Sequence, residues 1–388
     1  MKVLLAAVNA KYIHSNLGIY SLKAYGEKML AEQGFKREQV QIELAEYTIN
    51  HQLEQILKDL YCRKPDVIGF SCYIWNISYI KCLLADIKKV LPEVKIWLGG
   101  PEVSYCGEEI LREQPAVDLV MKGEGEETFA QLLKVLVEKE ESGVSFSGYL
   151  EEIKQKGIPG LVFLDSQGNK DGASWGTFTG SDGQAGWPVY DTGIRPPMDM
   201  NRIPFPYGFL EMERLEHRII YYESSRGCPF SCAYCLSSID KSVRFRSLEL
   251  VREELAFFLS ARVPQVKFVD RTFNCKKSHA MAIWQFIREN DNGITNFHFE
   301  IAADLLDQEE LDLLSSMRPG LIQLEIGVQS TNPDTLSAIR RKTDIAGMRE
   351  ITRQINSWHN IHQHLDLIAG LPHEDLSSFK RSFNEVYD

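Results

Sequence analysis

The sequence lacks an excess of basic residues: among 388 residues, 54 Asp and Glu outnumber 43 Lys and Arg, so the formal net charge is -11. Binding nucleic acid through its phosphates generally requires a basic surface, so no nucleic-acid partner is expected and a small-molecule or peptide substrate is favoured. No uncharged apolar run approaches the ~20 residues of a membrane span. The short apolar start at 1–16 lacks a small-residue cleavage site and alternates like a strand. We therefore expect a cytoplasmic protein without a membrane span.

A disulfide framework is not indicated either, although the chain has eight cysteines. There is no export signal, and three cysteines crowd into one short segment at Cys228, Cys232 and Cys235, which favours ligation over pairing. The other five are scattered, and free cysteines are common in protein cores. We assign them no role, but a ligand or radical-relay role stays open for Cys275.

Strand-like and helical patterns alternate through residues 1–137. Each apolar strand-like run is followed by a helical pattern, which is typical of a parallel sheet covered on both faces, with ligands at the carboxyl ends of the strands. The fold class is therefore α/β, and the first domain is expected to be a doubly wound parallel sheet. Strands are expected at 2–8, 40–45, 66–71, 95–98 and 117–121, with helices from about 17, 52, 77, 108 and 126.

Residues 138–207 differ in character and are expected to form a linker. They contain a charged stretch, an isolated strand at 158–164 and a Gly- and Ser-rich tract at 166–195 that is expected to form a surface excursion.

From 208 to 388 the alternation resumes with five βα units, which predict a partial barrel with its active site at the strand carboxyl ends. The pattern stops at Asp388, one unit short of six, so a truncated barrel is expected. Strands are expected at 218–224, 266–270, 297–302, 321–328 and 364–369, with helices from 248, 278, 308, 334 and 376.

The cysteine triplet has the spacing C-x3-C-x2-C and follows the first strand of this second series. Cysteine thiolates normally ligate all four irons of a [4Fe-4S] cluster, so a three-cysteine loop leaves one iron open for an external ligand. A structural zinc ion is the alternative, but it requires four ligands, and no fourth partner lies nearby in the sequence. The triplet therefore predicts a cluster with an open iron.

These residues resemble the radical S-adenosylmethionine superfamily, whose C-x3-C-x-aromatic-C signature is matched with Tyr234 as the aromatic. The resemblance implies that S-adenosylmethionine binds the open iron and that Tyr234 packs near its adenine; a ring that shields the cluster from water is the alternative. Asp270 would replace the family's usual acceptor for the methionyl ammonium group. A simple turn is the alternative for Gly370. The residues expected to bind S-adenosylmethionine are Tyr234, Asp270, Glu300, Glu325, Gln329, Ser330 and Gly370.

The loops after the first-domain strands resemble those of the cobalamin-binding domain that precedes some radical S-adenosylmethionine barrels. Glycines there permit close backbone approach to a ligand. The D-x-H-x-x-G motif of another cobalamin family is absent, because Tyr12 replaces its Asp, so His14 is expected to be a loop residue and not a cobalt ligand. A dinucleotide is disfavoured because no G-x-G-x-x-G follows the first strand. The residues expected to contact cobalamin are Asn9, Ser71, Asn76, Gly99, Gly100, Pro101, Gly123, Glu124 and Gly125.

The resemblance as a whole is to cobalamin-binding radical S-adenosylmethionine proteins of the class B methylase type, with a flavodoxin-like first domain and a partial (β/α)6 barrel. It implies a 5′-deoxyadenosyl radical, an electron donor such as flavodoxin or ferredoxin, and C-methylation of an unknown substrate. Non-methylating rearrangement, oxidation or thiolation without cobalamin is an alternative, and a non-catalytic iron-sulfur sensor is another. No catalytic residue beyond the cofactor ligands is identified.

Overall fold

The computed structural model describes residues 1–36, 38–140, 146–165, 188–208, 210 and 215–387. The chain divides into two compact units, Met1–Met198 with Arg202–Glu211, and Asp199–Asn201 with Met212–Asp388. Within the described ranges, no helix has both the length and the apolar character needed to cross a membrane.

The first unit is built on a seven-stranded sheet with the order β2-β1-β3-β4-β5-β6-β7. Strands β1 to β5 are parallel to their neighbours, and their order 2-1-3-4-5 is the flavodoxin-like order, so the expected doubly wound parallel sheet is confirmed. The strand order reverses between β1 and β3, and folds of this kind bind ligands at that point, outside the carboxyl ends of the strands. The strands are β1 Lys2–Asn9, β2 Gln41–Thr48, β3 Val67–Ser71, β4 Lys95–Gly99, β5 Leu119–Met121, β6 Leu161–Leu164 and β7 Val189–Asp191.

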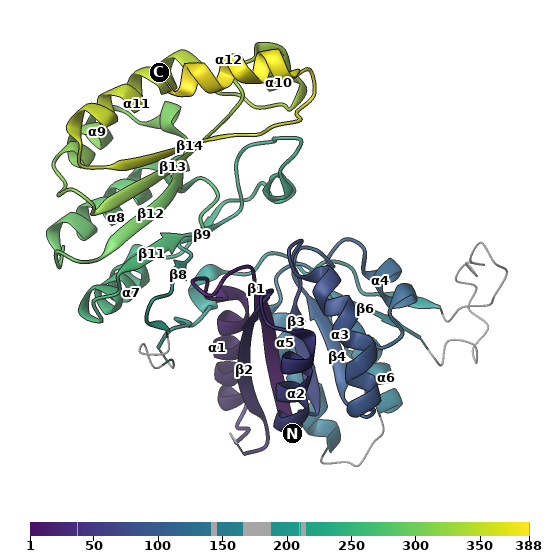
Figure 1. Ribbon diagram of the computed structural model, residues 1–388. Helices are drawn as coiled ribbons and strands as arrows, with labels where there is room; N and C mark the ends of the chain where they lie inside the picture. The colour runs from purple at the N-terminus through teal and green to yellow at the C-terminus, as the bar shows by residue number, and fades with distance from the viewer. Residues whose placement is uncertain (37, 141–145, 166–187, 209, 211–214, 388) are drawn as a thin grey trace. The chain divides into compact units, whose positions relative to one another are not determined.

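Helices cover both faces of this sheet (Figure 1). Buried side chains of α2 (Leu53–Arg63), α3 (Ile77–Val90) and α4 (Gly107–Glu113) join the apolar strand residues in one cluster. Helices α1 (Leu17–Glu32) and α5 (Glu126–Glu140) pack against each other, with Gly26 of α1 close to side chains of α5. Because the central strands are buried from both sides, they read as continuous apolar runs.

The strand expected at 158–164 is not isolated. Strand β6 pairs antiparallel with β5, and β7 pairs antiparallel with β6. Leu161, Val162 and Phe163 are almost fully buried, so their apolar surface is removed from water by extending the first sheet. Helix α6 (Phe146–Lys156) precedes them. The region expected as a linker therefore contributes to the first unit. Of the expected surface excursion, 166–187 lie outside the described residues.

The second unit contains a five-stranded parallel sheet with the order β14-β13-β12-β11-β8, one strand for each expected βα unit. The expected partial barrel is therefore confirmed, with helices against one side of the sheet (Figure 1). Its elements are β8 Ile220–Tyr222, β11 Gln265–Phe268, β12 Asn296–Ile301, β13 Ile322–Gln329, β14 His362–Leu367, α7 Leu248–Ser260, α8 Lys277–Glu289, α9 Gln308–Ser315, α10 Pro333–Ala338, α11 Ile345–Trp358 and α12 Leu376–Tyr387.

The two faces of this sheet differ in chemistry. Along β13, Ile322, Leu324, Ile326 and Val328 are fully buried, whereas the intervening residues 323, 325, 327 and 329 are half-buried. Successive side chains of a strand point to opposite faces, so one face is apolar and packs on the helices, while the other is polar. Barrel interiors are commonly filled with branched apolar side chains. A polar inner face suits a polar ligand.

Two local features were not anticipated by the sequence patterns. The helix expected from Asp334 is split into α10 and α11, because Asp344 starts a new helix by accepting a hydrogen bond from the Gly347 N–H at 3.1 Å. In addition, β9 (Ser225–Arg226) pairs antiparallel with β10 (Arg244–Phe245). This short ribbon closes the segment that carries the three cysteines.

Candidate functional site: a cysteine loop at the barrel end

The cysteine loop is fixed at both ends by backbone contacts. Gly227 has φ +97°, and a Cβ there would lie 2.5 Å from the Ser242 carbonyl oxygen, so only glycine fits between β9 and the returning chain. The Cys228 N–H donates to the Asp240 carbonyl at 3.2 Å, and the Ala233 N–H donates to the Ile339 carbonyl at 2.9 Å. The loop therefore contacts the segment that leads into β10 and the residue that caps the carboxyl end of α10.

The three cysteines lie on this one loop, with Cys228 and Cys232 buried and Cys235 half-buried. The Cys228 Sγ lies 3.6 Å from the Thr272 Oγ1, and Arg341 Nη1 donates to the Cys232 Sγ at 3.9 Å. Donors that face sulfur suit thiolate ligands. Among the described residues, no three His, Cys, Asp or Glu side chains are arranged to hold a single metal ion. In a cluster the cysteine sulfurs bind separate irons, so three thiols on one loop, with the Arg341 guanidinium as a donor beside Cys232, fit a [4Fe-4S] group.

Arg341 is a site residue that the sequence patterns missed. Its guanidinium contacts Cys232, and its Nη2 also donates to the Gly327 carbonyl of β13. A planar guanidinium at this position suits recognition of a carboxylate beside the cysteine loop. Arg341 belongs to an Arg-Arg-Lys run that interrupts the helical pattern before Asp344, and this run could have indicated it in the sequence.

Asp270 does not lie where its expected role requires. It is completely buried, and its carboxylate accepts hydrogen bonds from the Ser224 N–H at 3.0 Å and from the Ser224 and Ser225 hydroxyls at 2.6 Å. No surface of the side chain is left for the ammonium group of a ligand. The geometry therefore argues against Asp270 as an ammonium acceptor and assigns it to the base of the cysteine loop.

Glu300 and Glu325 lie opposite each other on β12 and β13, on the polar inner face. Glu325 lies 3.1 Å from His298 Nε2 and accepts from Lys267 Nζ at 2.7 Å, and these partners, His298 first, lower the pKa of Glu325 to about 2. Burial raises the pKa of Glu300, and the neighbouring Glu325 charge raises it further. Lys267 therefore bonds closely to Glu325 and lies 4.0 Å from Glu300, whose charge also bears the cost of partial burial beside a like charge.

Lys267, His298 and Asp366 belong to the same inner face and were not predicted from the sequence. Lys267 on β11 is paired in register with His298 on β12, and Asp366 on β14 is paired with Gly327 on β13. Burial and the Glu325 charge raise the pKa of Asp366. The signal was available, because charged residues at alternate positions of an otherwise apolar strand mark its polar face.

Gln329, Ser330 and Gly370 lie together where β13 and β14 end. Gln329 has φ +70°, an uncommon conformation for a residue with a side chain, and its carbonyl accepts from the Ile368 N–H at 3.0 Å. Ser330 is buried and donates to Glu374 Oε1 at 2.7 Å. Gly370 has φ +85° with no atom within 4 Å of an added Cβ, so it borders open space. Tyr234, on the cysteine loop, is exposed.

The expected cobalamin loops meet at the carboxyl edge of β1, β3, β4 and β5, which are neighbours in the first sheet. A Cβ on Gly100, at φ +112°, would lie 2.5 Å from the Cys72 carbonyl oxygen, so the loops after β3 and β4 touch through a glycine. Gly123 has φ +70°, and its N–H donates to the Ser104 hydroxyl at 3.2 Å. Ser71 and Gly99 are the last residues of β3 and β4, and Pro101, Glu124 and Gly125 lie on the loops after β4 and β5.

Asn9 and Asn76 are also at this edge, but their side chains serve the protein itself. Asn9 Nδ2 donates to the His14 carbonyl and to Glu46, both at 3.0 Å. Asn76 is fully buried and donates to the Val8 and Ser71 carbonyls at 2.9 Å. These amides shape the loops, and they are not directed at a ligand as expected.

Exposed apolar side chains gather at the same edge. Trp75 is 45% exposed and stacks on Tyr73, with ring centroids 4.4 Å apart, in the loop after β3. Single exposed apolar residues are common, but a cluster of large ones on surface loops is unusual and marks a binding surface. The others follow β1, β2, β4 and β7 and are Tyr12, Ile13, Ile49, Tyr105 and Ile194, with Ile74 beside Trp75.

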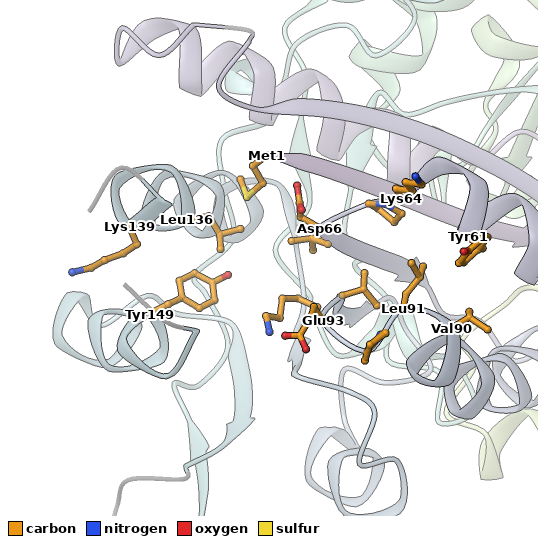
Figure 2. A pocket seen from close by; sticks show the side chains of 15 residues that line it. Met1, Tyr61, Lys64, Asp66, Val90, Leu91, Glu93, Leu136, Lys139 and Tyr149 are labelled. Carbon is orange, nitrogen blue, oxygen red and sulfur yellow. The ribbon is translucent and has the colours of Figure 1, made fainter. Parts of the chain in front are cut away.

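A cavity of about 580 Å³ lies at the opposite, amino-terminal edge of the first sheet (Figure 2). Met1, Asp66 and Lys95, at the starts of β1, β3 and β4, line it together with Leu136 and Tyr149. It contains none of the expected site residues, and ligands of this fold bind at the other edge.

Comparison with known proteins gives two family matches, the B12 binding domain over residues 3–133 and the Radical SAM superfamily over residues 222–386. The uncharacterized methyltransferase PH0819 of Pyrococcus horikoshii is 29% identical over 56% of this chain and 42% of its own length. Cobalamin-dependent radical SAM methyltransferase TokK of Streptomyces tokunonensis is 25% identical over 84% and 45%. Anaerobic magnesium-protoporphyrin IX monomethyl ester cyclase of Rubrivivax gelatinosus is 21% identical over 86% and 56%. The chain spans about half the length of these relatives.

Among solved structures, the cobalamin-dependent radical enzyme OxsB, with aqua-cobalamin and S-adenosylmethionine bound, gives a TM-score of 0.71 over 100% of this chain and 52% of that one, at 18% identity. This likeness shows that the fold is shared. The radical SAM family implies a [4Fe-4S] cluster and S-adenosylmethionine, and the other match implies cobalamin. Two domain matches in this order, with the cysteine loop at the barrel end, identify the chain as a member of the radical SAM proteins that carry a B12-binding domain.

Proposed function

We propose that this chain catalyses cobalamin-dependent radical C-methylation of a small-molecule or peptide substrate. The observation that carries the proposal is the cysteine loop, in which Cys228, Cys232 and Cys235 follow β8, the first strand of a half-barrel with a polar inner face. When bound, the cluster supplies the electron that cleaves S-adenosylmethionine to a 5′-deoxyadenosyl radical. The chain would contribute ligands, orientation and exclusion of water.

On the barrel side, the inner-face carboxylates of Glu300, Glu325 and Asp366 are proposed to face S-adenosylmethionine, which carries both a sulfonium and an ammonium charge. The paired Glu325 stays ionised, because Lys267 and His298 hold its pKa low. Hydroxyl groups of a ribose donate well to such a carboxylate. The exposed Gly370 lets a flat base approach the backbone, and Arg341 is placed to bind the methionyl carboxylate.

On the first unit, the carboxyl edge with its glycine-lined loops and exposed apolar side chains is proposed to bind the corrin ring. A corrin is a broad apolar disc, so aromatic side chains such as Trp75 would cover part of it. Trp75→Ala is expected to lower the corrinoid absorbance retained after gel filtration with hydroxocobalamin at least several-fold. The matched control is Tyr61→Ala, an exposed aromatic outside this edge, which should retain it. Equal retention in both variants would contradict this placement.

The reaction is tested by anaerobic incubation of the iron- and sulfide-reconstituted chain with cobalamin, dithionite and S-adenosylmethionine. Formation of 5′-deoxyadenosine supports radical chemistry, and S-adenosylhomocysteine formed together with it supports methyl transfer. Cys235→Ala is the control, because it should form neither product by this route. Absence of 5′-deoxyadenosine from the cluster-loaded wild-type chain would favour the iron-sulfur sensor instead.

Non-methylating radical chemistry is the second candidate, favoured by the likeness to a protein named as a ring-forming cyclase. The same assay separates the two. The cyclase-type reaction would give 5′-deoxyadenosine without S-adenosylhomocysteine, because no methyl group leaves S-adenosylmethionine.

A further inference from the structure

The buried carboxylate of Asp270 lies at the base of the cysteine loop. Its three hydrogen-bond donors come from Ser224 and Ser225, the residues that lead into β9 and the loop. Two residues beyond Asp270, the Thr272 hydroxyl lies 3.6 Å from the Cys228 Sγ. Asp270 is therefore connected to the cysteine loop in two ways, through its serine partners and through Thr272. It is itself completely buried.

Asp270 has no cationic partner among its described contacts, which is unusual for a fully buried carboxylate. Burial raises its pKa to about 6, and the nearby Glu223 charge acts in the same direction, although the serine donors oppose both. Glu223 is itself paired with Arg226 at 2.8 Å. A carboxyl group in this environment can exist in either protonation state near neutral pH.

The hydrogen-bond network around Asp270 can accommodate both states. Ser224 Oγ lies 3.1 Å from Nε2 of His279, a buried ring on α8 whose pKa is lowered to about 4 by burial, so it is neutral at neutral pH. A hydroxyl both donates and accepts. When Asp270 is ionised, the Ser224 hydroxyl donates to it and accepts a hydrogen bond from the His279 tautomer that carries its proton on Nε2. When Asp270 is protonated, the Ser224 hydroxyl can accept from the Asp270 O–H and donate to Nε2 of the other tautomer. The contacts among these three side chains can be kept in both states because the neutral ring has two tautomers.

The titratable groups that face Asp270 come from each neighbouring element. Tyr222 and Glu223 lie at the end of β8, and Cys275 lies on the turn after β11. The Cys228 and Asp270 charges both contribute to the raised pKa of Cys275, so this thiol lies within electrostatic reach of both groups. Burial raises the pKa values of Tyr222 and Cys275, so neither titrates before Asp270 as the pH rises from acid.

We propose that Asp270 couples reduction of the [4Fe-4S] cluster to the uptake of one proton. This inference rests on the proposed function, because it requires the cluster. The electron comes from a low-potential one-electron donor and enters the cluster, while a proton from solvent forms an O–H bond on the Asp270 carboxylate; no other bond forms or breaks. The negative charge gained by the cluster favours the neutral carboxyl group, so electron and proton stabilise each other.

The test is the midpoint potential of the reconstituted chain, measured by EPR-monitored redox titration at several pH values between 5.5 and 9. The wild type is expected to show a potential that falls as pH rises above about 6, with a slope approaching 59 mV per pH unit, the value for one proton per electron. Asp270→Asn should remove this slope and raise the potential at alkaline pH, because the amide has no charge to oppose the electron. Asp312→Asn, an exposed site on α9, should behave as wild type.

If Asp270→Asn does not load a cluster, Ser225→Ala tests whether Asp270 takes up the proton. Loss of one donor to the ionised carboxylate raises its pKa, so the onset of the slope should move to higher pH, whereas Ser260→Ala at the exposed end of α7 should not move it. A pH-independent potential in the wild type, a slope that persists in Asp270→Asn, or an unmoved onset in Ser225→Ala would overturn the inference alone. Failure of the wild-type chain to assemble a cluster would overturn the proposed function and this inference with it.

Discussion

At the scale of single residues, the three cysteines expected as metal ligands lie on one loop, whereas several polar residues expected to contact cofactors bond to the chain itself. The three cysteines can be recognised by their spacing in the sequence, because all three lie on one short loop. Asp270, Asn9 and Asn76 were expected to contact cofactors, but burial and hydrogen bonding to the chain occupy them. Whether a polar side chain faces a ligand or the protein depends on tertiary neighbours, which spacing does not encode.

The cysteine ligands give the first prediction. Replacing any of Cys228, Cys232 or Cys235 with Ala should lower the iron content and abolish the broad visible absorbance of the reconstituted chain. Cys275→Ala is the matched control, because this half-buried thiol lies on a different turn and should leave both unchanged. Full iron content in a ligand variant, or loss of iron in Cys275→Ala, would contradict the assignment of ligands.

The low pKa of Glu325 gives the second prediction. A depressed pKa adds stability above the unfolded value of about 4.3, and this stability disappears as pH falls through the folded value of about 2. At pH 7, Glu325→Gln should therefore lower the free energy of unfolding by on the order of 3 kcal/mol, measured by urea titration. Between pH 4.3 and 2 the difference from wild type should shrink. A difference that grows on acidification would contradict the pairing with His298 and Lys267.

At the scale of elements, alternation of apolar and polar residues predicted the parallel strands of both units. It missed β9 and β10, because two-residue strands have no period, and it missed the pairing of β6, because antiparallel addition at a sheet edge depends on which edge is free. The break between α10 and α11 carries Arg341, so the missed boundary also hid a site residue. Local propensity does not determine long-range pairing.

The loop contact at Gly100 gives the third prediction. Gly100→Ala adds a Cβ 2.5 Å from the Cys72 carbonyl oxygen at a positive φ, so it should destabilise the first unit by roughly 2–3 kcal/mol and weaken cobalamin retention. Gly34→Ala is the control, since its φ is also positive but no atom lies within 4 Å of the added Cβ. It should cost about 1 kcal/mol and leave retention unchanged. Equal effects of the two substitutions would show that the close approach is unimportant.

At the scale of the whole molecule, the order of two α/β units could be predicted because each has its own strand and helix pattern and its own glycine or cysteine loops. The boundary between them could not, since the segment at 146–164 is locally ambiguous and joins the first sheet only through burial of Leu161, Val162 and Phe163. The substrate is equally unreadable, because its recognition depends on surfaces that no motif describes.

If the cysteine loop holds a cluster with one iron open to S-adenosylmethionine, the EPR spectrum of the dithionite-reduced, reconstituted chain should respond to this ligand. Spectra are compared without and with S-adenosylmethionine, with S-adenosylhomocysteine as a control that lacks the sulfonium. We expect a [4Fe-4S]⁺ signal in the wild type whose g values shift when S-adenosylmethionine is added, and no such signal in Cys228→Ala. A fully loaded cluster whose spectrum is unchanged by S-adenosylmethionine would contradict it.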